Sequence, residues 1–132
     1  MSEQHGVVWW SELMTRDPAM AKDYYHEVCG WEFEEMPMEG GTYVLGKSGG
    51  RPVVGIMDIT NVDGMGTLPP HWFTYLAVDD VDVAVERTRA NGGRIVREPF
   101  DVSGVGRIAI VTDPTGATVG LMTPSQAESA AA

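Results

Sequence analysis

An internal repeat is the feature that most constrains this sequence, because a repeated unit is expected to fold the same way twice. The segment DPAMAKDYYHEVCGW begins at Asp17, and the similar segment DVDVAVERTRANGGR begins at Asp80. Each follows an apolar run typical of a strand and starts with an aspartate suited to cap a helix. Each also carries a glycine suited to end that helix, Gly30 or Gly93, before a short extended stretch. We therefore expect two tandem copies of one unit.

Apolar alternation and turn residues extend this pattern to β-α-β-β-β in each copy. The first copy is predicted to contain a helix at 17–28 and strands at 7–14, 31–36, 42–47 and 52–58. The second copy is predicted to contain a helix at 80–91 and strands at 72–78, 94–98, 106–112 and 117–123. The chain is thus predicted to be a single domain, with unit one at about 6–58, a linker at 59–70, unit two at about 71–124 and a tail at 125–132.

The repeat also predicts the fold class. One copy of about 60 residues buries too little apolar surface to be stable alone. We expect an α+β fold in which the two units form a curved mixed sheet around a cavity, with the helices on its convex face. The helix residues expected to pack on that face are Ala21, Tyr24, Tyr25, Val28, Val81, Ala84 and Val85.

Charge and composition narrow the partners and the location. The formal net charge of the 132 residues is −10, which repels nucleic acid and anionic membranes, so neither is a predicted partner. The lone cysteine, Cys29, cannot form an internal disulfide and is expected to be a small buried residue. The opening MSEQHGVVWW carries no basic stretch and no long apolar run. No secretory signal or membrane span is predicted, and the cytoplasm is the expected location.

Three segments carry a resemblance to a known family. They are WWSELMTRDPAMAKDYYHEVCGWEF, HWFTYLAVDDVDVAVERTRANGGRIV and the closing GVGRIAIVTDPTGATVGLM. Over residues 6–124 the chain resembles the vicinal oxygen chelate superfamily (glyoxalase I, bleomycin-resistance proteins, extradiol dioxygenases), and it is most similar to the small glyoxalase-like branch. The resemblance implies the fold described above, and dimers are common among proteins of this architecture.

The resemblance also implies four positions for the ligands of a catalytic metal, two on the first strands and two on the last strands of the units. Carried over to this sequence, these positions are Trp10, Gly55, Phe73 and Gly120. Divalent zinc, iron and manganese need imidazole, carboxylate or thiolate ligands, and none of these four side chains provides one. No metal and no other cofactor is therefore predicted.

Strand alternation then predicts a ligand-binding face. If the four positions face the cavity, its lining comprises Trp10, Glu12, Met14, Met57, Phe73, Tyr75 and Met122. Aromatic and methionine side chains suit a flat, apolar small molecule, and Gly55 and Gly120 are expected to leave room for it. Glu12 is the candidate catalytic residue: a carboxylate among apolar groups is expected to have a raised pKa, and it could act as an acid or base or pair with a cationic ligand.

The favoured function is therefore a glyoxalase- or bleomycin-resistance-like small-molecule binding protein without the usual metal site. One alternative is a metal-dependent lyase, isomerase or dioxygenase, for which Glu12, His71 and His5 are the only candidate ligands. Another is a homodimeric interaction module whose cavity is filled by its own side chains. The histidines, His26 included, lack the spacing of a metal motif. The fold does not choose among these functions, because one fold hosts many chemistries.

Overall fold

The computed structural model describes residues 2–38, 41–62 and 66–125, so most of the predicted tail lies outside the described residues. The chain forms two compact units, which we name after their helices. The α1 unit is Trp10–Phe73 and contains helix α1 (Pro18–Cys29). The α2 unit is Met1–Trp9 with Thr74–Ala132 and contains helix α2 (Val81–Ala90). In the described part of the chain, no helix is long and apolar enough to cross a membrane.

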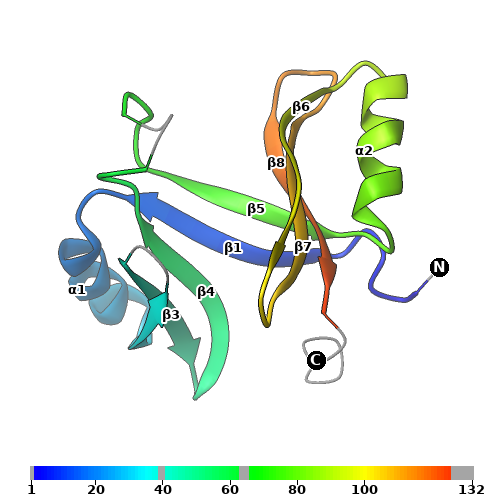
Figure 1. The fold of residues 1–132 in the computed structure, drawn as a ribbon. Helices are drawn as coiled ribbons and strands as arrows, with labels where there is room; N and C mark the ends of the chain where they lie inside the picture. Colours follow the sequence, from blue (N-terminus) through cyan, green and yellow to red (C-terminus); the bar gives the residue numbers. More distant parts are fainter. Residues whose placement is uncertain (1, 39–40, 63–65, 126–132) are drawn as a thin grey trace. The chain divides into compact units, whose positions relative to one another are not determined.

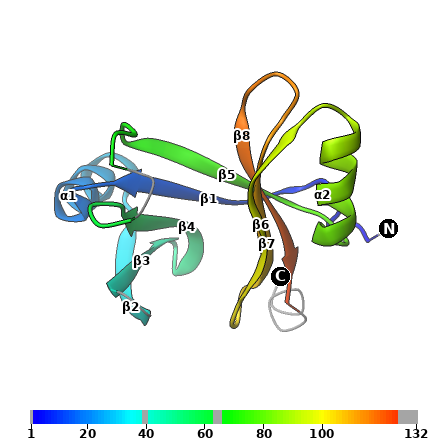
Figure 2. The same cartoon turned by 45° about the horizontal axis from the view of Figure 1, so that its top comes forward.

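In the α1 unit the strand order is β2-β3-β4-β1 (Figures 1 and 2). Strands β2 (Glu32–Met38), β3 (Gly41–Ser48) and β4 (Arg51–Asp58) pair antiparallel in succession. Strand β4 then pairs in parallel with β1 (Val8–Thr15). The parallel pairing requires the chain to cross over between β1 and the other strands, and α1 makes the first part of that connection.

The α2 unit repeats this arrangement with the order β5-β8-β7-β6. Strands β6 (Arg94–Val102), β7 (Gly106–Thr112) and β8 (Thr118–Pro124) pair antiparallel in succession, and β8 pairs in parallel with β5 (His71–Ala77). The predicted α+β class, the mixed pairing and the two tandem β-α-β-β-β units are confirmed.

Both helices begin where the sequence predicted. The Asp17 carboxylate accepts a hydrogen bond from the Met20 amide at 3.0 Å, and the Asp80 carboxylate caps α2 in the same way. Gly30 ends α1 in the left-handed conformation with φ 72°, as expected. The prediction for the end of α2 is wrong: the cap is Asn91 and not Gly93, because the Asn91 amide already bonds the Arg87 carbonyl.

The core of the α1 unit is a cluster of Leu13, Val44 and Ile56, against which Ala21, Tyr25 and Phe33 pack. The expected packing of Tyr24 and Val28 is wrong, since the exposed fraction is 56% for Tyr24 and 60% for Val28. The apolar contact of α1 with the core of its sheet is made by Ala21 and Tyr25. Cys29 is likewise exposed and not buried, because it ends the helix beyond that contact.

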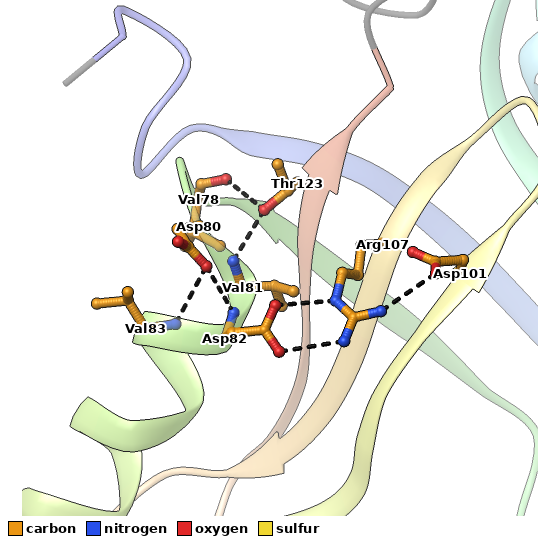
Figure 3. A network of polar contacts seen from close by, with 8 residues as sticks. All are labelled: Val78, Asp80, Val81, Asp82, Val83, Asp101, Arg107 and Thr123. Atoms are coloured by element: carbon orange, nitrogen blue, oxygen red, sulfur yellow. Dashed lines mark hydrogen bonds and ion pairs between the residues drawn. The ribbon is translucent and has the colours of Figure 1, made fainter.

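The core of the α2 unit is a cluster of Val81, Val85, Ala109, Val111 and Leu121. Ala84 packs against it, so the predicted apolar stripe of α2 is confirmed. Polar contacts also fasten the start of α2 to the neighbouring strands (Figure 3). The Thr123 hydroxyl accepts a hydrogen bond from the Val81 amide at 2.9 Å and donates one to the Val78 carbonyl at 3.0 Å.

Candidate functional site

The register of β1 against β4 decides which side chains share a face of the sheet in the α1 unit. Leu13 pairs with Ile56, and both belong to the core beneath α1. Successive residues of a strand point to opposite faces. Glu12, Met14 and Met57 therefore point away from the helix, as does the space above Gly55, which pairs with Glu12.

Glu12 lies on this face as a buried carboxylate, with 7% of the residue exposed. The Tyr43 hydroxyl donates a hydrogen bond of 2.6 Å to Glu12 Oε2. The Trp10 indole Nε1 donates in turn to the Tyr43 hydroxyl oxygen at 3.1 Å. Burying a carboxylate is costly unless hydrogen bonds compensate it, so these contacts help to account for its position. The result is a chain of donors that runs from Trp10 through Tyr43 to Glu12.

Tyr43 is a residue that the sequence analysis missed. Its neighbour Val44 lies in the core beneath α1, so alternation along β3 sends the Tyr43 side chain to the face of Glu12. A methyl group added to Gly55 would overlap the Tyr43 hydroxyl and ring. The expectation that Gly55 leaves room for a ligand is therefore wrong, because Tyr43 fills that space. Alternation was a usable signal for the face, but only the register between strands brings Tyr43 over Gly55.

The other predicted lining residues divide between the two units. Trp10 and Met57 are half-buried and Met14 is buried, and with Glu12 they share one unit. Phe73, which is buried, ends the same unit. The predicted lining residues in the α2 unit are Tyr75, which pairs with Gly120, and Met122, which pairs with Ala77, and both are buried. The structure brings Trp10, Glu12, Met14 and Met57 onto one face. That Phe73, Tyr75 and Met122 contribute to the same site stays a prediction.

The histidines have separate local partners. His5 Nδ1 accepts a hydrogen bond from the Asp79 amide at 2.9 Å, and His71 Nδ1 lies 2.8 Å from the Pro69 carbonyl oxygen. The Trp31 carbonyl beside the exposed His26 ring, helped by the Glu32 carboxylate, raises the pKa of His26.

The metal ligands that the resemblance implies do not fit the residues present. Trp10 offers an N–H donor, Phe73 an unreactive ring, and Gly55 and Gly120 no side chain at all. Among the described residues, no three histidine, cysteine, aspartate or glutamate side chains gather as a metal site.

A cleft of about 520 Å³ lies within the α2 unit, alongside its helix. Its wall includes the apolar side chains of Val83, Ala84 and Val119, with Arg87 and Asp79 among its charged residues. Each predicted ligand-binding residue lies in the described part of the chain, and none of them lines this cleft. The cleft belongs to the α2 unit, whereas Glu12 belongs to the α1 unit.

Comparisons with known proteins agree with the fold. A model of the glyoxalase/bleomycin resistance protein/dioxygenase superfamily matches residues 7–121. "Putative glyoxylase CFP32" of Mycobacterium bovis is 38% identical over 120 residues, which cover 89% of this chain and 46% of that protein. "Anthracycline biosynthesis protein DnrV" of Streptomyces peucetius is 32% identical over 124 residues, which cover 85% of this chain and 45% of that protein. The chain therefore spans less than half the length of these curated relatives.

Solved structures extend the likeness at lower identity. Methylmalonyl-CoA epimerase from Mycobacterium tuberculosis superposes with a TM-score of 0.66 at 19% identity, over 100% of this chain and 97% of that chain. A methylmalonyl-CoA epimerase in complex with methylmalonyl-CoA and NH4+ gives 0.69 at 19% identity, over 94% and 98% of the two chains. At such identity the likeness shows a shared fold and leaves the reaction open.

Proposed function

Because the chain belongs to the glyoxalase/bleomycin resistance protein/dioxygenase superfamily, as its motifs predicted, we propose that it binds a small, flat, largely apolar organic molecule without a divalent metal. The ligand surface is the face of the α1 unit that carries Glu12. The observation that carries the proposal is this carboxylate, 7% exposed and hydrogen-bonded by Tyr43 beside apolar side chains. Small-molecule sites typically combine an apolar lining with one or two such fixed polar groups.

The side chains next to Glu12 support an apolar ligand. Met14 and Met57 pair across β1 and β4, two residues beyond Glu12 and Gly55 and on the same face. The Trp10 indole lies at the other end of this run. Methionine side chains adapt to irregular ligands, and aromatic rings offer flat surfaces for stacking.

The absence of ligand chemistry at the four metal positions supports the metal-free part of the proposal. The residues there are Trp10, Gly55, Phe73 and Gly120, and the space above Gly55 is filled by the Tyr43 ring. The name of the relative from Streptomyces peucetius supports the choice of a flat ligand, since anthracyclines are polycyclic aromatic molecules.

The first test is a thermal-shift and equilibrium-dialysis screen against planar aromatic compounds, with elemental analysis of the purified protein. We expect saturable binding of at least one compound and no stoichiometric metal. Met57→Ala should weaken this binding, whereas Met20→Ala should leave it unchanged, because Met20 is 68% exposed on α1. Near-stoichiometric zinc, nickel, manganese or iron that stabilises the fold would favour the metal-dependent enzyme instead. A uniformly negative screen would favour an interaction module.

A further inference from the structure

We infer that Tyr43 determines the specificity of the proposed site and that Gly55 is the positioning residue that makes room for it. In this role Tyr43, and not a metal ion, forms the polar centre of the face in the α1 unit. The ligand that this site selects is a planar organic molecule that presents a hydrogen-bond donor or a positive charge to Glu12, in preference to a carboxylate, and Tyr43 limits the preference for a cation by donating to Glu12. The ligand part of this inference rests on the proposed function, whereas its geometric part does not.

The first step is the dependence of Tyr43 on Gly55. A Cβ atom on Gly55 would collide with the Tyr43 hydroxyl and ring carbons. The backbone of Gly55 needs no left-handed conformation, so the close approach of Tyr43 is what requires glycine here. Any larger residue must displace the Tyr43 side chain, which is anchored at its far end by the hydroxyl contacts with Glu12 and Trp10.

The second step is that two of the three metal positions of this unit, Trp10 and Gly55, now serve Tyr43. Trp10 directs its indole N–H at the Tyr43 hydroxyl oxygen, and Gly55 provides the space in which that hydroxyl lies. A hydroxyl that accepts one hydrogen bond and donates another is polarised along the chain of donors. The acceptor at the end of this chain is the buried carboxylate of Glu12.

The third step is the ligand that this arrangement accepts. The Glu12 carboxylate and a net charge of −10 both disfavour an anionic ligand. The Tyr43 hydroxyl donates a hydrogen bond to Glu12 Oε2 and stabilises the carboxylate, which reduces what a cationic ligand gains from contact with Glu12. Removal of that hydroxyl should therefore increase the preference for positively charged ligands.

The geometric part is tested without ligand by two-dimensional ¹⁵N–¹H spectra of the tryptophan indoles. Gly55→Ala and Tyr43→Phe should both move the Trp10 indole resonance, in the same direction, because each removes its acceptor. The Trp72 indole is an internal reference, since it donates to the Tyr25 hydroxyl at 3.1 Å and should stay in place. A Trp10 resonance that Gly55→Ala leaves unmoved would overturn the inference. If Gly55→Ala does not fold, the double variant Gly55→Ala/Tyr43→Ala removes the ring that the new methyl group would overlap and should restore folding; a failure to restore it would overturn the role of Gly55.

Two matched control variants separate this effect from general perturbation. Tyr24→Phe removes a phenol hydroxyl from an exposed position on α1, and Gly66→Ala adds a methyl group where no atom lies within 4 Å. Neither should move the Trp10 resonance.

The ligand part is tested with an aminoacridine, which is a cation, and the matching acridine carboxylate. The wild-type protein should bind the amine more tightly, and Tyr43→Phe and Gly55→Ala should each widen that ratio of affinities by roughly tenfold. Tyr24→Phe should leave the ratio unchanged. An equal ratio in all four proteins would refute the role of Tyr43 in specificity. If neither probe binds, the ligand part falls with the proposed function, and the indole result still decides the geometric part.

Discussion

The two units place different side chains on the same backbone register. In the α1 unit the parallel pair β1–β4 sets Glu12 opposite Gly55, and in the α2 unit the pair β5–β8 sets Tyr75 opposite Gly120. In both units the next pair of residues along the strands is aliphatic and lies toward the helix: Leu13 with Ile56 in one unit, and Leu76 with Leu121 in the other. The repeat therefore keeps its helix-side chemistry and differs on the opposite face, where one unit carries a carboxylate and the other a phenol.

The third strand of each unit enlarges this difference. Val44 in β3 and Ala109 in β7 hold equivalent places, because each pairs with the residue that follows the glycine of the last strand. The residues before them are Tyr43 and Ile108. Tyr43 donates a hydrogen bond to Glu12, whereas Ile108 is a buried aliphatic residue without a polar group to donate. The comparison teaches that the α1 unit is the one equipped for polar recognition on this face.

The largest predicted effect tests the shared helix-side chemistry. Ile56 follows Gly55 and Leu121 follows Gly120. The exposed fraction is 0% for Ile56 and 8% for Leu121. Ile56→Ala and Leu121→Ala should each lower the free energy of unfolding by about 2–5 kcal/mol, with the larger loss at the fully buried Ile56. Urea unfolding followed by circular dichroism measures both. Val96→Ala is the control, because Val96 is 57% exposed. A loss at only one of the two positions would break the equivalence of the units.

The next effect tests the face on which the units differ. Tyr43→Phe removes the donor to the buried Glu12 and should cost about 1–3 kcal/mol of unfolding free energy. The equivalent change in the other unit, Ile108→Val, removes only one methyl group and should cost about 0.5–1.5 kcal/mol. A double-mutant cycle with Glu12→Leu, which removes the acceptor, followed by urea unfolding, isolates the coupling between Tyr43 and Glu12. A coupling near zero would mean that the hydrogen bond does not distinguish the units.

The helices and strands could be predicted because their signals are local. Asp17 and Asp80 cap α1 and α2 as predicted, since an N-terminal cap depends only on the next few residues of the chain. The packing of α1 could not be read as well. Tyr24 has the spacing of a core residue but is exposed, because the contact of α1 with its sheet is narrow. A hydrophobic stripe in the sequence predicts which side of a helix is apolar, but it does not predict how much of that side the sheet covers.

The candidate site could be predicted only as far as strand alternation reaches. Alternation correctly separates Glu12 from Leu13, because the two faces follow from sequence position alone. Tyr43 is different, since its contact with Glu12 depends on the register of β1, β4 and β3 together. Register is a tertiary property, and no turn residue or spacing in the sequence fixes it across three strands.

A smaller effect compares the starts of the two helices. The Asp80 carboxylate accepts hydrogen bonds from the Asp82 and Val83 amides, whereas that of Asp17 accepts one from the Met20 amide. Asp80→Ala should therefore cost about 1 kcal/mol of unfolding free energy, and Asp17→Ala somewhat less. Thermal unfolding at fixed pH would check the order, and Asp80→Asn is the control that keeps a side-chain acceptor. The reverse order would show that the number of cap bonds does not separate the units.

The smallest effect concerns the exposed charges of the α2 unit, where Arg107 bonds Asp82 through two nitrogens at 2.9 and 3.1 Å and reaches Asp101 at 3.2 Å (Figure 3). These bonds hold the pKa of Asp82 below its ordinary value of 3.8. A lowered pKa stabilises the fold above the ordinary value, and that contribution disappears as the pH falls through the lowered value. Arg107→Gln should thus be slightly less stable than the wild type near neutral pH and equally stable in strong acid, with the difference reduced by salt because the pair is exposed. Urea midpoints measured from neutral to acidic pH, with a carboxyl NMR titration of Asp82, test this. A stability difference that persists in strong acid would contradict it and would mean that Arg107 acts through packing and not through its charge.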